Sequence, residues 1–404
     1  MRTGGVFVAG FSDAVKTIQY AGELAGSAAS ELLDKLADTI RGEADTLRDG
    51  TELYPVELPR DLFAHEHAQT EWWYYTGHIE SRSHRRFGFE LVFFKRRTDL
   101  DRFGIVPLRL LGNPIYFAHF ALTDTSEKKF RYAHRKSGNG LFDYPAAASS
   151  SHFYLRLGEW SVRESHGCHV LQATMNGDVS LEARLKPVKN PILNGELKNG
   201  VSLKDEGQAS RYFSFTRMEV EGELTIEGRT EHVSGSAWMD REFGTWTATD
   251  KQKGWDWFSI QMSNGTELMI YQLRDGEDKV SEYSSGVFVS EDGRQTYLAR
   301  DQVSVTPVGY WKSSRSGTTY PSGWKVNVPS LAISLAVDPV MEEQELDTRG
   351  TTMIVYWEGA CHVSGSFGGS EVGGNAYIEL VGYDRSHENP NLAHFLMGDH
   401  FESE

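Results

Sequence analysis

EWWYYTGHIESRSHRRFGFELVFF, residues 71–94, contains two aromatic and apolar runs on either side of the polar segment SRSHRR. Apolar runs separated by a short polar segment are typical of a β-hairpin. We therefore predict strands over Tyr74–Glu80 and Phe87–Phe94. Since alternate residues of a strand share a face, one face of this hairpin is expected to carry Trp72, Tyr74, Thr76 and His78.

A second segment, GWDWFSIQMSNGTELMIYQLRDG at residues 254–276, resembles the first. Its alternate residues Trp255, Trp257, Ser259 and Gln261 repeat the order aromatic, aromatic, hydroxyl, polar. The Asn264-Gly265 pair favours a tight hairpin turn. The repeat predicts two related β domains in tandem, over residues 56–246 and 247–395, between an N-terminal segment 1–55 and a tail 396–404.

Composition supports an all-β protein built of antiparallel β-barrels or sandwiches. Many short apolar runs are interrupted by Asn, Asp, Ser and the 40 glycines among 404 residues. The net charge of −16 argues against a nucleic acid partner, since phosphate binding needs a basic surface. The two cysteines, Cys168 and Cys361, are expected to be buried free thiols, and a cytoplasmic location is expected.

Residues 11–48 have apolar side chains at helical spacing, which predicts an N-terminal amphipathic helix ending near Gly50. One interpretation is peripheral contact with a membrane, or a cover over a pocket. The alternative is packing against the helix's own domain or against another subunit of a homo-oligomer. The acidic polar face, with Glu31 and Asp34, favours packing. No run reaches the roughly 20 apolar residues of a spanning helix.

SGSAWMDREFGTW, residues 234–246, is the densest group of charges among aromatic side chains. Asp240, Arg241 and Glu242 lie between Trp238 and Phe243, close to the predicted domain junction. A carboxyl group buried there would have a raised pKa and could act as an acid or a base. An Asp–Arg ion pair that joins the domains is the alternative, and residue types alone favour it.

Other polar side chains lie within apolar strands. His119 shares a predicted face with Phe117, and Tyr356 and Tyr377 lie near Glu358 and Glu379, either of which could reach a cavity. The pair His65 and His67 is too unspecific to predict a metal site. The sequence contains no P-loop, dinucleotide-binding glycine motif, G-x-S-x-G elbow or zinc-type cysteine spacing, so we expect no cofactor.

The motifs EWWYYTGHI, FGFELVFF, YFAHFALTD, SGSAWMDREFGT, GWDWFSIQ and LMIYQLR resemble the carotenoid 1,2-hydratase (hydroxyneurosporene synthase) family. The resemblance extends from about His65 to Tyr383. It implies two tandem lipocalin-like β domains and a binding site for a long apolar molecule. It also implies similarity to fungal decalin-forming Diels–Alderases, so the fold is better defined than the reaction.

The sequence departs from the hydratase branch at its polar residues. The resemblance implies His and Trp at the turn DREFG, where this chain has Arg241 and Phe243. It also implies a tyrosine followed two residues later by aspartate, where this chain has Tyr271 and Leu273. Only the tyrosine matches, so Asp240 or Glu242 would have to supply the proton.

Three functions are compatible with these features: a cofactor-independent hydratase, isomerase or cyclase of an isoprenoid or polyene; a non-catalytic carrier of such a molecule; and a protein whose aromatic faces only join two domains. A cavity of several hundred cubic ångströms would favour the first two, and a filled interior would argue against both. The expected catalytic residues are Asp240, Arg241, Glu242, Tyr271 and His119. The expected ligand-binding residues are Trp72, Tyr74, His78, Phe117, Trp238, Phe243, Trp255, Trp257, Gln261, Tyr356 and Tyr377.

Overall fold

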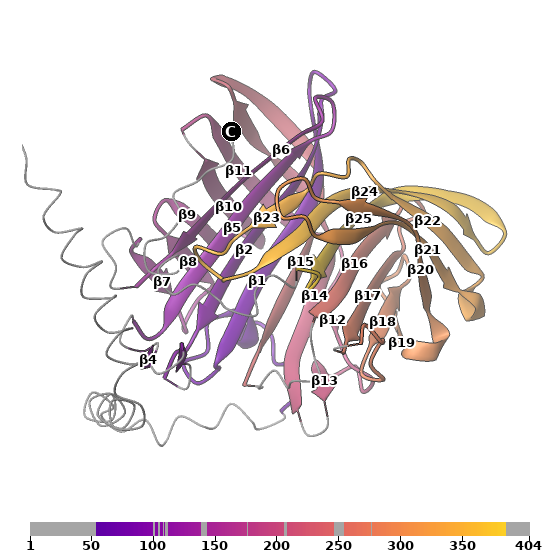
Figure 1. Cartoon of the computed structure of the whole chain (residues 1–404), viewed down its shortest axis with the longest axis horizontal. Helices are drawn as coiled ribbons and strands as arrows, with labels where there is room; N and C mark the ends of the chain where they lie inside the picture. The colour runs from indigo at the N-terminus through magenta and orange to yellow at the C-terminus, as the bar shows by residue number, and fades with distance from the viewer. Residues whose placement is uncertain are drawn as a thin grey trace, which may run out of the picture.

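The chain forms two curled antiparallel β-sheets that pack side by side (Figure 1). The computed structural model describes residues 54–99, 102–103, 106–107, 109, 112–138, 144–175, 177–205, 208–245, 254–275 and 277–384. The predicted all-β class is confirmed. The predicted N-terminal helix lies outside the described residues, so its expected contacts with a membrane or another subunit remain predictions.

The first sheet has the strand order β6-β5-β2-β1-β15-β14-β11-β10-β9-β8-β7, with β12 and β13 paired to β14. The strands are β1 (Thr70–Ser81), β2 (Arg86–Arg96), β5 (Ile115–Asp124), β6 (Lys129–Lys136), β7 (Ala146–Ala148), β8 (Tyr154–Leu157), β9 (Trp160–Ser165), β10 (Cys168–Met175), β11 (Val179–Pro187), β12 (Ile192–Leu193), β13 (Val201–Asp205), β14 (Gln208–Ile226) and β15 (Arg229–Gly244). A separate short ribbon joins β3 (Arg102–Phe103) to β4 (Val106–Pro107).

The second sheet has the order β19-β18-β17-β16-β25-β24-β22-β21-β20, with β23 paired to β24. The strands are β16 (Gly254–Met262), β17 (Glu267–Arg274), β18 (Ser285–Val289), β19 (Gln295–Ala299), β20 (Ser304–Lys312), β21 (Thr319–Val328), β22 (Ile333–Pro339), β23 (Glu345–Asp347), β24 (Val355–Phe367) and β25 (Ser370–Val381). The described helical turns are η2 (Arg60–Leu62), η4 (Arg300–Gln302) and η5 (Pro329–Leu331).

The two predicted hairpins occupy equivalent places in the two sheets. β1 pairs with β2 and with the last strand of its sheet, β15, while β16 pairs with β17 and with the last strand of its sheet, β25. Gly265 in the second hairpin has a φ of +77°, which a residue with a side chain rarely adopts. The predicted domain boundary falls between β15 and β16, where residues 246–253 are not described, so it remains a prediction.

Each sheet packs a hydrophobic core on one face and contacts the other sheet with its opposite face. Alternation along β1 places Trp73, Tyr75 and Ile79 in the core of the first sheet. Tyr74, on the other face, belongs with Trp257 of β16 to a separate cluster between the sheets. The strand period of two therefore assigns each aromatic residue of the hairpin either to a core or to the interface.

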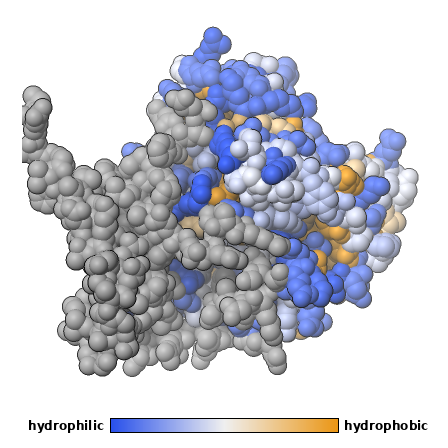
Figure 2. Space-filling model, viewed as in Figure 1, coloured by the Kyte–Doolittle hydropathy of each residue, from blue (hydrophilic) through white to orange (hydrophobic). Residues whose placement is uncertain are grey.

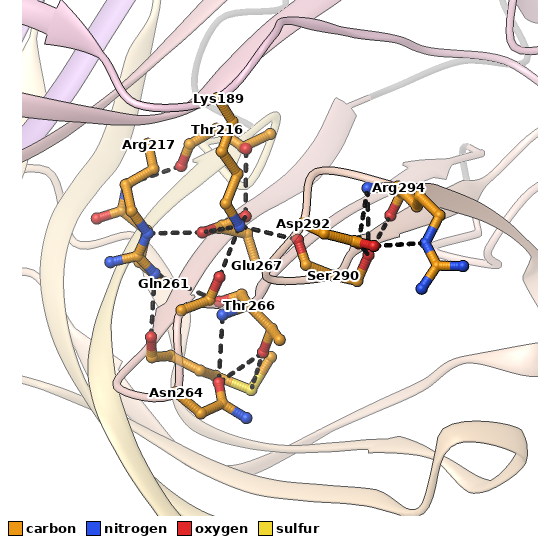
Figure 3. Close-up of polar contacts among 12 residues, drawn as sticks. Lys189, Thr216, Arg217, Gln261, Asn264, Thr266, Glu267, Ser290, Asp292 and Arg294 are labelled. Atoms are coloured by element: carbon orange, nitrogen blue, oxygen red, sulfur yellow. Dashed lines mark hydrogen bonds and ion pairs between the residues drawn. The ribbon is translucent and has the colours of Figure 1, made fainter.

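Ion pairs also join the sheets at one side of the interface, as Figure 3 shows. Glu267 of β17 is fully buried. Its carboxylate forms ion pairs with Lys189, whose Nζ lies 2.8 Å from Oε2, and with Arg217, whose Nε lies 2.6 Å from Oε1. Both cations come from the half of the chain that forms the first sheet. Lys189 Nζ also donates to the carbonyl oxygens of Gly265 and Ser290, at 2.6 and 2.9 Å. We call Lys189, Arg217 and Glu267 the ion-pair latch.

The visible outer surface of the described residues is mainly hydrophilic, with orange hydrophobic areas that include one over the second sheet (Figure 2). Exposed charged pairs among the described residues include Arg86–Glu80 and Lys279–Glu277. Among the described residues, no helix has the length and apolar character needed to cross a membrane.

Candidate functional site between the sheets

The aromatic faces predicted from the two hairpins meet each other between the sheets. The ring of Trp257 lies 5.1 Å from that of Tyr74 and 6.2 Å from that of Trp238, edge to face in both cases. The indole Nε1 of Trp257 donates to Tyr212 OH at 3.1 Å. The aromatic residues therefore line an interface between the two halves of the chain.

Three glutamates from both sheets lie within this interface, and we call Glu90, Glu358 and Glu379 the acid cluster. Glu90 lies on β2 opposite Thr76 of β1, so it shares the interface side of the hairpin with Tyr74. Glu358 of β24 lies directly opposite Glu379 of β25. Glu90 and Glu358 are fully buried. Each acid is placed by strand alternation among aromatic neighbours.

Hydrogen bonds satisfy only part of the acid cluster. Tyr74 OH donates to Glu358 Oε1. Tyr356 OH donates to Glu90 Oε1 at 3.5 Å, and Trp255 Nε1 donates to Glu379 Oε2 at 2.8 Å. Within the described part of the chain, the Oε2 atoms of Glu90 and Glu358 have no hydrogen-bond partner. Buried polar atoms are almost always paired, so these two oxygens are exceptions among the buried groups of the interface.

Burial raises the pKa of each acid in the cluster. Loss of solvation raises the pKa of Glu90 and of Glu358 well above the ordinary value, and the neighbouring carboxyl groups add to the effect. Burial also raises the pKa of Glu379 to about 7. Desolvation and nearby like charge both favour the neutral form of a carboxyl group. Burial and neighbouring carboxyl groups therefore favour the neutral, protonated form of Glu90 and Glu358.

Asp240 lies beside the acid cluster in a different environment. Its carboxyl group accepts hydrogen bonds from Trp238 Nε1 at 2.6 Å and from Tyr212 OH. Burial raises its pKa to about 6, despite the opposing effect of hydrogen bonds from Ser214, Tyr212 and Trp238. The carboxylate form of Asp240 therefore predominates at neutral pH. Its pKa lies near neutrality, which suits a group that accepts a proton.

Glu242 belongs to a second polar group, on the same face of β15 as Asp240. Lys204 Nζ lies 2.6 Å from Glu242 Oε1, and Ser210 Oγ donates to the same oxygen. The ammonium group of Lys204 also lies 4.8 Å from the ring centre of Tyr271 and 5.4 Å from that of Tyr212. Glu242 is therefore paired with a cation, whereas no cation is hydrogen-bonded to Glu90 or Glu358 in the described residues.

Arg241 and Phe243 were expected in the same site, but the structure places them on the opposite face of β15. Arg241 pairs with Trp73 in the strand register, and its guanidinium group binds Glu71, the carbonyl oxygen of Phe63 and His65 Nδ1. Arg241 holds the pKa of Glu71 well below its ordinary value, against the effect of burial. The expected orientation of Asp240 by Arg241 is therefore wrong, and so is the alternative of an Asp240–Arg241 interdomain pair.

Most other predicted site residues lie between the sheets. His78 Nε2 contacts Ala376 O at 2.9 Å, and Gln261 Nε2 donates to Thr216 O at 2.7 Å. Tyr271 OH lies 3.0 Å from Ser202 Oγ, and His119 Nδ1 lies 2.7 Å from Tyr356 OH. The structure also brings into this interface Trp72, Trp255 and Tyr377, while Phe117 pairs with Phe94 on the first sheet.

Sequence reasoning overlooked Glu90 and Lys204, and it noted Glu358 and Glu379 without including them in the site. A usable signal was the single acid within the apolar run FGFELVFF, because an unpaired charge there is unfavourable unless it has a role. The partnership of Lys204 with Glu242 depends on the pairing of β13 with β14 and had no local signal. Among the residues described, no group of three or more His, Cys, Asp or Glu side chains is placed so that it could hold a metal ion.

A half-open pocket of about 10 Å³ lies at the interface and is lined by residues of β1, β15, β16 and β25. Its walls include Thr76, His78, Trp238, Gln261 and Tyr377. This volume is about that of one water molecule. The expected cavity of several hundred cubic ångströms is not confirmed in the described part of the chain.

Comparisons with known proteins match most of the chain. The family model described as AttH-like matches residues 49–383. A candidate AttH protein from Nitrosomonas europaea is 29% identical, with a TM-score of 0.71 over 81% of this chain and 97% of that one. Kievitone hydratase from Nectria haematococca is 15% identical, with a TM-score of 0.64 over 81% and 93%. CghA, solved with Sch210972, is 13% identical, with a TM-score of 0.52 over 84% and 96%. No curated protein sequence matches the chain.

Proposed function

Because the chain belongs to the AttH-like family and shares its fold with a hydratase, we propose that it is a cofactor-independent enzyme acting on a large hydrophobic molecule. The substrate class that suits the aromatic interface is an isoprenoid or a polyene. The reaction is hydration, isomerisation or ring closure. Hydration, isomerisation and cationic ring closure begin when a carbon–carbon double bond receives a proton, whereas a pericyclic ring closure needs only shape and a few hydrogen bonds.

The observation that carries this proposal is the acid cluster. A contact that only joins two domains needs no buried carboxyl groups, because aliphatic side chains would stabilise it at lower cost. Here Glu90 and Glu358 are fully buried, and each has an oxygen without a partner. Perturbed acids in an apolar environment are typical of catalytic sites. The arrangement supports proton donation to an apolar substrate.

In the proposed reaction, the Glu90 carboxyl group transfers its proton to one carbon of the double bond. The adjacent carbon becomes positive, and the faces of Tyr74 and Trp257 stabilise this charge. For hydration, a water molecule adds to that carbon and gives a proton to a carboxylate, for which Asp240 is suited. For isomerisation, a neighbouring carbon loses the proton instead. Each path returns the net charge of the site to its starting value.

A substrate larger than the existing cavity has to displace side chains between the sheets. Trp72, Phe94 and Trp255 are only partly buried and pack against the interface cluster. We propose that these three form the entrance, since their rotation needs no break in either sheet. Kievitone hydratase and CghA share the two-sheet fold, which supports a common location for the site without defining this protein's substrate.

The first experiment compares the wild type with Glu90→Gln and Glu358→Gln. A panel of isoprenoids and polyenes is incubated with each protein in deuterated water, and carbon-bound deuterium is measured by mass spectrometry. We expect deuterium incorporation by the wild type. We expect a decrease of about 10²- to 10⁴-fold in Glu90→Gln, which lacks the proposed proton donor. Thr123→Val is the control, because it alters a hydrogen bond of the interface without removing a carboxyl group. Equal incorporation by all four proteins would contradict the proposal.

A carrier without catalytic activity is the alternative. It is favoured by Asp240, whose hydrogen bonds with Trp238 and Tyr212 suit a structural role. Organic extraction of the purified protein would then yield a bound hydrophobic molecule that is returned unchanged after incubation. If Asp240→Asn lowers the melting temperature without altering the extracted molecule, the carrier is supported over the enzyme.

A further inference from the structure

A line of hydrogen-bonding side chains connects the acid cluster to a histidine nearer the surface. His134 Nδ1 lies 3.0 Å from Thr351 Oγ1, which lies 3.4 Å from His119 Nε2. His119 Nδ1 lies 2.7 Å from Tyr356 OH, whose hydroxyl donates to Glu90 Oε1 at 3.5 Å. We call His134, Thr351, His119, Tyr356 and Glu90 the histidine chain.

The histidine chain crosses between the two halves of the molecule four times, once at each of its hydrogen bonds. His134 of β6, His119 of β5 and Glu90 of β2 belong to the first sheet, and their strands are neighbours in the order β6-β5-β2. Tyr356 of β24 and the nearby Thr351 come from the second half of the chain. His119 and His134 are directly opposite each other in the strand register. Neither half alone could therefore form a continuous line.

The donors and acceptors can all be oriented in one direction. His134 Nδ1–H donates to Thr351, the hydroxyl of Thr351 donates to His119 Nε2, His119 Nδ1–H donates to Tyr356, and Tyr356 donates to Glu90. This orientation requires a neutral His119. His119 is fully buried, and burial lowers its pKa well below the ordinary value. Thr351 Oγ1 also lies 3.2 Å from the carbonyl oxygen of Thr348, so its single hydroxyl hydrogen has two acceptors within reach.

The two ends of the histidine chain differ in their access to water. Glu90 is fully buried, whereas His134 is partly exposed. The ring of His134 stacks on Tyr132 at 6.4 Å and is close enough to Asp347 to interact with its charge. An ordinary histidine changes its charge within the physiological pH range, which suits a group that exchanges protons with solvent.

We propose that the histidine chain conducts protons between solvent at His134 and the carboxyl group of Glu90. In the inward direction, His134 gives a proton to Thr351, and each following group gives one proton and receives one. Glu90 gains the proton on Oε1, and rotation of its carboxyl group presents it to the interface. His134 takes up a replacement proton from solvent at Nε2, and rotation of the two hydroxyl groups and of the imidazole rings returns the histidine chain to its starting orientation.

The use of this chain in turnover rests on the proposed function. Glu90 loses its proton to the substrate, while the proton released by the added water is left on another carboxylate. Glu90 must regain a proton before the next turnover. Because Glu90 has no direct contact with solvent, a hydrogen-bonded route is needed for that step. His134, Thr351 and His119 are thus positioning residues that act through Glu90, not catalytic residues.

The experiment follows the proton directly and needs no substrate. The protein is transferred rapidly into D₂O, and infrared difference spectroscopy records the shift of protonated carboxyl bands with time. The band lost in Glu90→Gln identifies Glu90. We expect Thr351→Val to slow deuteration of that band by about tenfold or more, because its methyl group cannot pass a proton. Thr351→Ser, which keeps the hydroxyl group, should exchange at nearly the wild-type rate.

The matched control is Thr123→Val. Thr123 Oγ1 donates to Gln344 Oε1 at 2.8 Å in the same interface, but it is not part of the histidine chain. His134→Gln provides a second test if Thr351→Val does not fold. Equal deuteration rates in the wild type, Thr351→Val and His134→Gln would overturn proton conduction by the histidine chain but not the proposed function. Absence of a Glu90 band would show an ionised Glu90 and would overturn the proposed function as well.

Discussion

Asp240 shows how a single residue links the site to stability. Its pKa rises from 3.8 to about 6 in the folded protein, because burial disfavours the charged form. The folded state therefore keeps a proton over a pH range in which the unfolded state has lost it. Asp240 therefore makes its full stabilising contribution to the free energy of unfolding below about pH 4. This contribution is lost as the pH rises to about 6.

This pH dependence of the free energy of unfolding leads to a prediction for Asp240→Asn. Between pH 4 and pH 7, the free energy of unfolding of the wild type relative to the variant should fall by up to about 3 kcal/mol, the equivalent of the raised pKa. Urea denaturation at both pH values measures this difference. Comparing the two proteins at each pH removes the contribution of every other titrating group. A difference that does not vary with pH would show that Asp240 is not desolvated as described.

The contrast between Asp240 and Arg241 shows why neighbouring residues could not be assigned from sequence. Both were expected in one site because they are adjacent in a charged segment that resembled a turn. The segment instead continues β15, so successive side chains point to opposite faces. The aromatic faces of the hairpins were predicted correctly because each lay on a strand whose period was evident. Ion pairs such as Arg241 with Glu71 depend on strand register, which no local pattern contains.

At the scale of elements, β2 and β24 approach each other closely at Gly88. A Cβ atom added to Gly88 would lie 2.5 Å from the Cβ of Ala360, closer than two methyl groups can pack. The absence of a side chain at Gly88 lets the strand carrying Glu90 lie against the strand carrying Glu358. The position of the acid cluster thus depends on a glycine outside it.

We predict that Gly88→Ala lowers the free energy of unfolding by about 1–3 kcal/mol, since overpacking separates the two strands. The double variant Gly88→Ala with Ala360→Gly moves the methyl group to the other strand and should recover most of this loss. Gly373→Ala is the control, because its added Cβ would lie at an ordinary 3.5 Å from Val363 O. Thermal and urea denaturation provide the measurements. No recovery in the double variant would refute the proposed contact.

At the scale of the whole molecule, sequence predicted the parts better than their assembly. Two related hairpins indicated two β domains, and the family resemblance is confirmed by the AttH-like match over residues 49–383. The sequence did not show which strands from the two halves would meet. The acid cluster and the histidine chain both combine residues about 200 or more positions apart. Such sites arise only when the two sheets pack, so their residues carry weak local signals.

The ion-pair latch is expected to determine how firmly the two sheets hold each other. Lys189→Met removes one of two cations from the buried carboxylate of Glu267 and leaves Arg217 as its partner. We expect the free energy of unfolding to fall by about 1–3 kcal/mol, less than for complete loss of a buried pair. Hydrogen exchange should rise in β14 and β17 before it rises in strands remote from the interface. Lys279→Met, in an exposed pair with Glu277, should alter neither quantity noticeably. If exchange in Lys189→Met rises uniformly over both sheets, the latch acts on global stability and does not control the separation of the sheets at the proposed site.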